Sequence, residues 1–372
     1  MVGYTDCMTK TRVVSHITRR SLLLGTLAGG LTLGLKTKAQ GSQVNSGEPQ
    51  PVNAVTGILE AFDRFPVVAL GEAHGWQEFH DFVQQLVRHP DFATKVDCIV
   101  VEFGNARYQS LMDRFIAGRE PVSVFELRKV WRNTTQSAWN TWDDPIYEQF
   151  FRAVRSVNRS LQKGQRRIRV LLGDPPVDWQ TTQALSVQGW FVYRDKHFAD
   201  VVTREVLEKN RKALLIAGFG HTSRAQPLVF AGETMVALLD KQYPGKVFGV
   251  LPHAPFSASL LQLEPRLANW PTPSLVAMGD DWLGRTPAAV LDTESSPLQT
   301  PGTLAQAADA YLYLGPGRDM TASQIDPAVF RDPVFAKELA RRRKLLGLDA
   351  DNQFKDLGSL EQPSIRYFPN KP

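Results

Sequence analysis

Short apolar runs alternate along this chain with segments in which apolar residues recur every three or four positions. The clearest run covers residues 67–70 and ends in a glycine, and residues 76–88 then place Phe79, Phe82 and Leu86 at helical spacing. Apolar runs bounded by glycine are typical of buried strands, and the longer repeat is typical of an amphipathic helix. The alternation predicts an α/β fold with a mostly parallel central sheet flanked by helices.

Each predicted strand is followed by an ionisable residue. The first run leads into Glu72 and His74. Four further runs cover residues 97–101, 168–173, 213–217 and 247–251, and they are followed by Glu102, Asp174, His221 and His253. In a parallel sheet the carboxyl ends of the strands meet at one rim, where ligands and catalytic groups gather. We therefore expect these side chains to form an active site on that rim.

Three helices are predicted between the second and third strands, over residues 106–116, 122–131 and 146–162. This connection is longer than an ordinary crossover between parallel strands. We therefore expect a helical insertion, about residues 106–162, over the rim. It carries three tryptophans among charged residues. That composition suits either a wall of the substrate site or a small core of the insertion's own.

The α/β domain is expected to span residues 55–345, after a polar linker at residues 40–54 and before a tail at residues 346–372. Close to 300 residues, on the order of the largest single cores, can bury a substantial interior. A further apolar run covers residues 310–314, and the last predicted helix ends in the basic run 341–344. We expect that run to be a solvated helix end.

The first 39 residues have the pattern of an export signal. Arg19 and Arg20 stand directly before an apolar, glycine-containing stretch that is short for a membrane span, and lysines follow it. This resembles a bacterial twin-arginine (Tat) signal peptide. We expect residues 1–39 to be removed, with the Tat machinery as export partner. The mature protein would be periplasmic or extracellular, with no stable membrane span.

Removing the signal also removes the positive charge. The whole chain has a formal net charge of +5, and residues 1–39 alone carry six Lys or Arg and one Asp. The mature protein is therefore near neutral. No basic patch with interleaved aromatic residues is present, so we expect no nucleic-acid partner. Cys98 is the single cysteine outside the signal, so an internal disulfide is excluded.

Two short motifs resemble a known superfamily. Both have the form Gly-x-x-His at the end of an apolar run, and they are Gly71-Glu72-Ala73-His74 and Gly218-Phe219-Gly220-His221. Glu102 ends a run between them. The pattern resembles the superfamily that joins the Tiki proteases, the TraB/PrgY-type proteins, the erythromycin esterases and the ChaN-like haem-binding uptake proteins. The first motif is most similar to that of the erythromycin esterases, which usually has one more residue between Glu and His.

The resemblance implies a hydrolase-like centre, and its residues would be Glu72, His74, Glu102 and His221. A divalent metal such as Zn or Mn would be held by His74, Glu102 and His221, with Glu72 as general base. Without a metal, His74 would take a proton from water, oriented by Glu72 or Glu102. His221 or Arg194 would then steady the oxyanion. Both schemes predict hydrolysis of an ester, lactone or peptide bond in a small-molecule or peptide substrate.

Other polar residues are placed around this centre. The candidate substrate-binding residues are Arg194, Asp174 and Arg107. Arg194 would clamp an anionic group or orient a rim carboxylate, although a surface ion pair with Asp195 or Asp200 is at least as common for arginine. Three further histidines rank below these residues, and they are His80, His197 and His253.

The same resemblance leaves a non-catalytic role open. A ChaN-like protein would bind haem, and the candidate iron ligands are Tyr108, Tyr147 and His253. A third alternative is a scaffold that keeps the fold without turnover. Haem carriage does not require four acid/base residues at strand ends, whereas hydrolysis does. The sequence therefore favours a hydrolase.

Overall fold

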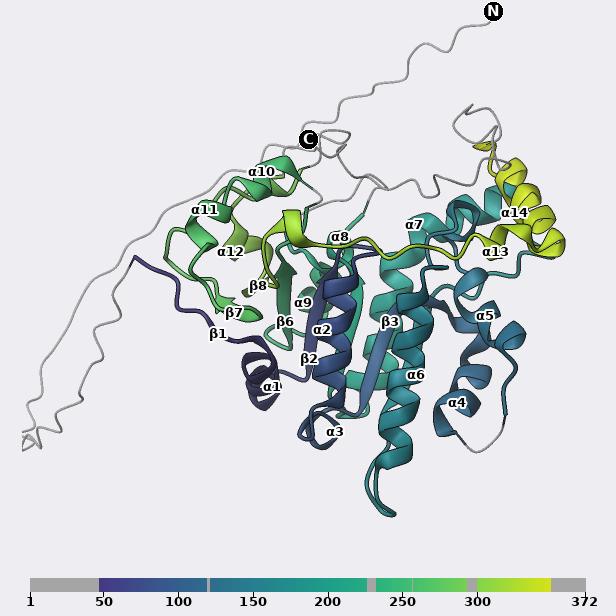
Figure 1. Cartoon of the computed structure of the whole chain (residues 1–372), viewed down its shortest axis with the longest axis horizontal. Helices are drawn as coiled ribbons and strands as arrows, with labels where there is room; N and C mark the ends of the chain where they lie inside the picture. Colours follow the sequence, from purple (N-terminus) through teal and green to yellow (C-terminus); the bar gives the residue numbers. More distant parts are fainter. Residues whose placement is uncertain (1–46, 119–120, 226–231, 256, 293–299, 349–372) are drawn as a thin grey trace, which may run out of the picture. The chain divides into compact units, whose positions relative to one another are not determined.

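The computed structural model describes residues 47–118, 121–225, 232–255, 257–292 and 300–348. The predicted signal peptide, residues 1–39, lies outside this described part. Within it, the chain forms a mixed, mostly parallel eight-stranded sheet flanked by helices (Figure 1), as the apolar pattern predicts. No helix among the described residues combines the length and the apolar character needed to cross a membrane.

The sheet has the strand order β1-β7-β8-β6-β2-β5-β3-β4. Its strands are β1 (Val52–Asn53), β2 (Val67–Glu72), β3 (Cys98–Asn105), β4 (Arg169–Asp174), β5 (Ala213–Gly218), β6 (Val247–Pro252), β7 (Ser274–Ala277) and β8 (Ala310–Tyr313). Strands β8 to β4 in this order run parallel, and β7 pairs antiparallel with both β8 and β1. All six predicted runs form strands. The sheet already begins at Val52, inside the predicted linker, because β1 pairs with β7.

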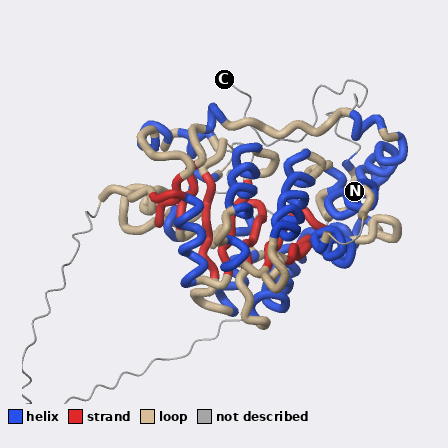
Figure 2. The backbone as a smooth tube through the Cα atoms, turned by 60° about the horizontal axis from the view of Figure 1, so that its bottom comes forward, coloured by secondary structure: helices blue, strands red, loops and turns tan. Residues whose placement is uncertain are grey.

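Helices cover both faces of the sheet, and Figure 2 shows them packed along the strands. The long ones are α1 (Ala54–Arg64), α2 (Gln77–Arg88), α6 (Pro145–Ser160), α7 (Ala184–Val202) and α9 (Met235–Gln242). Val68 and Leu70 of β2 belong to the apolar cluster of α1, α2 and α6, whereas Val67 and Ala69 belong to that of α7 and α9. Because side chains alternate along a strand, each rim residue is assigned to one of these two faces.

The connection from β3 to β4 contains α4 (Gln109–Ala117), α5 (Val124–Arg132) and α6. The buried residues of α6 include Phe150, Phe151 and Val154, and they join the same apolar cluster as α2. Helix α6 therefore lies beside α2 on one face of the sheet. The segment 133–144 between α5 and α6 also reaches the rim residues, because Thr135 binds Asp174 and Trp142 packs against His74.

The C-terminal helix α14 (Pro333–Leu345) packs against this connection. Its Arg342 is 4% exposed and donates to the Arg132 carbonyl and to Asn133 Oδ1, both at 2.6 Å. The guanidinium also lies over the Trp179 ring, 5.1 Å from its centroid. The expectation of a solvated helix end is therefore wrong for Arg342. Its long stem and five N–H donors suit a buried cluster of carbonyl oxygens.

Shorter helical turns connect these elements. They are α3 (Phe92–Lys95), α8 (Phe219–Thr222), α10 (Ala258–Leu261), α11 (Glu264–Leu267), α12 (Leu304–Ala307) and α13 (Ala328–Arg331). The 3₁₀ turns are η1 (Ala106–Tyr108), η2 (Ser137–Trp139), η4 (Ala288–Leu291) and η5 (Gly317–Asp319), and η3 (Thr203–Leu207) is a π-helical turn.

Candidate active site

Glu72 ends β2 and Glu102 lies in the second half of β3, the two strands that flank β5, and they point to opposite faces of the sheet. Glu72 shares the alternation of Leu70, so it faces α2 and α6. Glu102 shares that of Val100, so it faces α7. Each is 1% exposed. A buried carboxylate needs hydrogen-bond donors or positive charges around it, and both residues have them.

The Glu72 carboxylate is fixed from two helices. Its Oε1 accepts from the Tyr147 hydroxyl at 2.8 Å and lies 2.9 Å from His80 Nε2. Its Oε2 faces His74 Nδ1 at 3.6 Å and has no closer partner among the described residues. Burial by itself would raise the pKa of Glu72, but the two histidines lower that pKa to about 2. Glu72 is therefore an anion directed at His74.

His74 follows β2 on a loop, and its side chain is 33% exposed. Its ring meets Trp142 edge to face, with 4.5 Å between centroids. Burial lowers the pKa of a histidine, but Glu72 and then Glu102 raise the pKa of His74 above its usual value. With Nδ1 facing Glu72, Nε2 is the nitrogen that remains for a substrate or a water.

Gly218, at the end of β5, leaves the space in which His74 and Glu102 approach each other. A Cβ atom at this position would lie 3.0 Å from His74 Cε1 and 3.3 Å from Glu102 Oε2. A side chain there would displace both functional groups. Gly218, the first residue of the second Gly-x-x-His motif, is therefore needed because a larger residue would not fit there.

Glu102 is bonded on both oxygens. Its Oε2 accepts the Gly218 N–H at 2.6 Å, and its Oε1 accepts from the Arg194 guanidinium and lies 3.4 Å from His221 Nε2. Burial opposes ionisation, but His221 and Arg194 hold the pKa of Glu102 well below its usual range. The buried arginine therefore orients a rim carboxylate, which is one of the two roles predicted for it.

His221 lies on α8, with its side chain 12% exposed. Its Nδ1 is 2.9 Å from Asp195 Oδ1, and the same oxygen accepts the Met235 N–H at 2.7 Å. Although burial lowers the pKa of His221, Glu102 and Asp195 raise it to about 9. At neutral pH His221 is therefore an imidazolium that donates from Nδ1 to Asp195 and places its Nε2–H near Glu102.

Asp174 is completely buried. It accepts the N–H and the hydroxyl of Thr135 at 2.8 and 2.6 Å, and Arg194 Nε lies 3.7 Å away. Burial outweighs Arg194 and Thr135 and raises the pKa of Asp174 to about 7. Asp174 and Arg194 thus bind other protein groups, and Asp174 ties the α5–α6 segment to the sheet. Arg107 is half exposed and pairs with Asp178 at 2.9 Å.

Of the remaining histidines, His80 belongs to the site, whereas His197 and His253 bind other groups. His80 binds Glu72, so it belongs to the site although its sequence position ranked it low. His197 Nδ1 lies 2.8 Å from the Gly173 carbonyl oxygen. His253, at the end of β6, is buried between the Tyr311 hydroxyl at 2.6 Å and Glu264 at 3.2 Å. It takes part in a separate network on the other side of β2.

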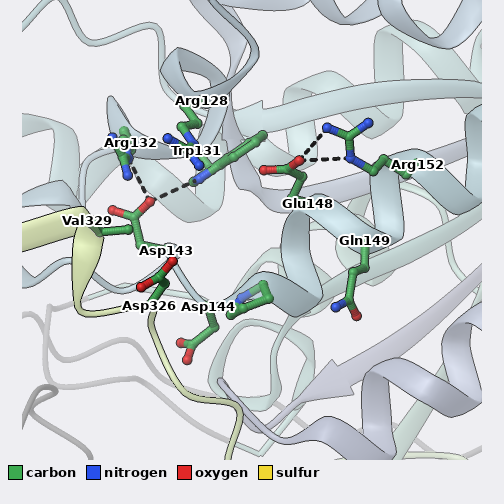
Figure 3. Close-up of a pocket in the computed structure, with 11 residues that line it drawn as sticks. Arg128, Trp131, Arg132, Asp143, Asp144, Glu148, Gln149, Arg152, Asp326 and Val329 are labelled. Atoms are coloured by element: carbon green, nitrogen blue, oxygen red, sulfur yellow. Dashed lines mark hydrogen bonds and ion pairs between the residues drawn. The ribbon is translucent and has the colours of Figure 1, made fainter. Parts of the chain in front are cut away.

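A pocket of about 270 Å³ lies beside this centre, between α5, α6 and the segment before α14 (Figure 3). Asp143 within it accepts from Arg132 Nε at 2.7 Å and Trp131 Nε1 at 3.3 Å. Asp144 also lines it, and its carboxylate would lie 3.7 Å from a Cβ atom on Gly75. The pocket borders the loop that carries His74, but none of the four predicted catalytic residues lines it.

The predicted metal ligands do not fit a divalent cation. Within the described residues, no three or more His, Cys, Asp or Glu are grouped so as to hold a metal ion. Both Glu102 oxygens accept protein N–H groups, and the Arg194 guanidinium already supplies the neutralising charge. The metal-free scheme agrees better with this donor set.

The three candidate haem ligands are also engaged. Tyr147 is completely buried and donates to Glu72, and His253 is completely buried between Tyr311 and Glu264. Tyr108 is partly buried, and its hydroxyl accepts from Asn133 at 2.7 Å. None of the three presents an unengaged atom to a porphyrin iron.

Comparison with known proteins gives likenesses of fold. No protein-family model and no curated protein matches the chain. A solved succinoglycan biosynthesis protein has 8% identity and a TM-score of 0.53, over 75% of this chain and 96% of that chain. A mutant of the erythromycin esterase EreC in its open conformation has 13% identity and a TM-score of 0.49, over 75% and 100%.

A third structure, ChaN of Campylobacter jejuni with cofacially bound haem, has 16% identity and a TM-score of 0.34, over 53% of this chain and 85% of that chain. At these identities the likenesses concern the fold alone. The likeness to the succinoglycan biosynthesis protein shows the fold.

Proposed function

We propose that this protein is a metal-independent hydrolase that activates water against an ester, lactone or peptide bond. The observation that carries the proposal is the position of His74. Its ring is partly exposed, its Nδ1 faces the buried Glu72 anion, and its other edge borders Gly218 and Glu102. An exposed imidazole oriented by a buried carboxylate is the arrangement that general-base catalysis requires.

Glu72 sets the tautomer of His74. A carboxylate at Nδ1 favours a proton on that nitrogen, which leaves the Nε2 lone pair to take a proton from water. The resulting hydroxide adds to the carbonyl carbon. The Glu72 anion stabilises the imidazolium that forms, as the carboxylate does in other acid–base triads. Tyr147 and His80 keep Glu72 in place by binding its other oxygen.

His221 supplies the positive partner. Its pKa of about 9 keeps it protonated at neutral pH. Its Nδ1 binds Asp195, and its Nε2–H, 3.4 Å from Glu102 Oε1, is the donor that can stabilise the oxyanion of the tetrahedral intermediate. When the C–O or C–N bond breaks, the leaving group takes the proton that His74 removed from water, and His74 returns to its neutral form. Arg194 does not contact the substrate. It binds Glu102, and Glu102 in turn orients His221.

The segment 133–144 forms a fixed wall of the site in this proposal. Trp142 packs against the His74 ring, and Thr135 is bonded to Asp174 through both its N–H and its hydroxyl. Asn105 Nδ2 also donates to a carbonyl oxygen of this segment, that of Asn133. These bonds favour a wall that keeps its position while substrate enters past the exposed edge of His74.

The test is hydrolysis of a panel of p-nitrophenyl esters, lactones and short peptides. We expect His74→Ala and His221→Ala each to lower kcat/KM at least about 100-fold, in the range found for lost general acid–base catalysis. His89→Ala is the matched control, because His89 is 40% exposed and lies in a loop after α2. Circular dichroism should show that all three variants stay folded.

Two results would count against the proposal. Unchanged turnover in either site variant would remove that histidine from the mechanism. If no substrate is hydrolysed and added haemin produces a saturable Soret band, the protein would be a haem-binding protein, and ChaN of Campylobacter jejuni is described as binding haem. That result would favour the haem alternative.

A further inference from the structure

A chain segment from the far end of the sequence lies against the loop that carries His74. Residues 320–326, called the crossing segment below, connect η5 with α13 (Figure 1). Trp76 forms an antiparallel bridge with Ala322 of this segment. About 245 positions separate the two in the chain, which is a costly closure unless the contact stabilises the folded state.

Three hydrogen bonds fasten this contact. Ser323 N–H donates to the Gly75 carbonyl at 2.7 Å, and Gln77 N–H donates to the Thr321 carbonyl at 2.9 Å. Thr321 N–H in turn lies 2.9 and 2.8 Å from the two carboxylate oxygens of Glu78. The first two bonds join backbone atoms, and the third has a charged side-chain acceptor. Glu78 is thus the side chain that fastens the crossing segment to the loop.

Gly75 transmits this contact to the catalytic groups. It has φ of 80°, in the left-handed region that favours glycine. Its carbonyl accepts from Ser323, and its N–H donates at 3.2 Å to the Tyr147 hydroxyl, which donates to Glu72. The carbonyl oxygen of Gly75 is therefore fixed by the crossing segment, and its N–H is fixed by the Tyr147 hydroxyl that binds Glu72.

His74 has few contacts of its own that would fix it. Its Nδ1 has no hydrogen-bond partner within normal distance among the described residues, and Glu72 Oε2 is 3.6 Å away. Apart from the packing of Trp142, its ring is held through the backbone that follows it. A small shift of Gly75 would therefore change the distance from Nδ1 to Glu72.

We propose that Glu78 is a positioning residue, which fastens the crossing segment on Gly75 and so sets the distance between His74 and Glu72. This inference rests on the proposed function for its catalytic consequence. The structural step does not depend on any substrate. Glu78 contacts neither Glu72 nor His74 in any recorded hydrogen bond, so it acts through the backbone.

The experiment compares Glu78→Ala and Glu78→Gln with the matched control Gln77→Ala. Gln77 is the neighbouring residue of α2, and its side chain binds Asp81 at 2.8 Å and not the crossing segment. We expect Glu78→Ala to speed amide exchange of Ser323 and Thr321 about 10-fold or more, and to lower kcat about 10- to 100-fold with little change in KM. Glu78→Gln keeps one acceptor oxygen and should fall between.

The pKa of His74, measured by nuclear magnetic resonance, is the second readout. Glu72 raises this pKa, so a longer distance in Glu78→Ala should bring it down towards the ordinary histidine value. A merely structural loss of stability would leave the pKa of His74 in the folded protein unchanged. Gln77→Ala should match the unsubstituted protein in exchange, titration and turnover.

A second pair keeps the test decisive if Glu78→Ala folds poorly. Thr321→Pro removes the N–H that Glu78 accepts, whereas Thr321→Ala keeps it. In Thr321→Pro the amide of Ser323 reports the contact. Faster exchange of Ser323 with an unchanged His74 titration would overturn the inference, and so would unchanged exchange of Ser323. If no substrate is turned over, a shifted His74 titration still supports the positioning role, while the missing turnover counts against the proposed hydrolase alone.

Discussion

Glu72 and His74 determine the expected pH dependence. The base form of His74 is the neutral one, and Glu72 raises its pKa above the usual value. Activity should therefore rise with pH through this raised pKa, and it should fall again near pH 9, where His221 loses its proton. The profile of kcat/KM against pH reports both groups.

The substitution Glu72→Gln tests this assignment. Without the carboxylate the pKa of His74 falls, so the acidic limb of kcat/KM should move to lower pH, while kcat drops because the imidazolium loses its anion. The alkaline limb, which belongs to His221, should stay near pH 9 and serves as the internal control. An acidic limb that stays in place would show that Glu72 does not act on the catalytic base.

At the scale of single residues, strand ends were predictable and their partners were not. Glu72, Glu102 and His221 follow apolar runs, so their place on the rim follows from the sequence pattern. Tyr147 reaches Glu72 from a helix 75 positions away, and no local pattern marks it. Asp195 was considered as an ion-pair partner for Arg194, but it binds His221. Such pairings depend on how helices cross the sheet.

At the scale of elements, α7 contrasts a buried ion pair with an exposed one. Arg194 is 4% exposed and bonded to Glu102, whereas Lys196 pairs with Asp200 in solvent, four positions apart on the same helix. Charges lose solvation when buried, so removing one partner leaves the other uncompensated. An exposed pair is solvated in either case and contributes little.

We therefore expect Arg194→Ala to lower the free energy of unfolding by about 3–5 kcal/mol, the range for breaking a buried ion pair. Lys196→Ala, on the same helix, should leave it nearly unchanged. Urea denaturation followed by circular dichroism measures both. Equal losses in the two variants would mean that the guanidinium is solvated and does not compensate Glu102.

The elements missed by the sequence analysis share a cause. β1 has two residues, which is too short for a hydrophobic period to be recognised, and β7 has four, as many as β8, which was predicted. Both are held at the sheet edge by antiparallel pairing, β7 with β8 and β1 with β7. The basic end of α14 was misread for a related reason, because the carbonyls that Arg342 binds come from a distant segment. Local pattern does not encode these contacts.

For the whole molecule, the rim was predictable because any parallel order brings strand ends to one edge. The order itself decided which residues meet. β2, β5, β3 and β4 are consecutive neighbours, and their ends supply the Glu72, Glu102, Asp174 and His221 network. β6 lies on the other side of β2, and its His253 found different partners. The sequence carried no comparable signal for that separation.

Export is the remaining property of the whole chain, and it was inferred from residues outside the described part. We expect the double variant Arg19→Lys with Arg20→Lys to stay in the cytoplasm, because the twin-arginine route requires the arginine pair. The two lysines keep the positive charge, so the variant tests the arginines and not the charge. Cell fractionation and immunoblotting of the tagged protein measure this. Arg12→Lys, a conservative change upstream of the pair, is the control and should leave export intact. Equal export of both variants would show that the arginine pair is not the signal. A mature protein beginning at Gln40 that stayed in the membrane would contradict the prediction that no stable span remains.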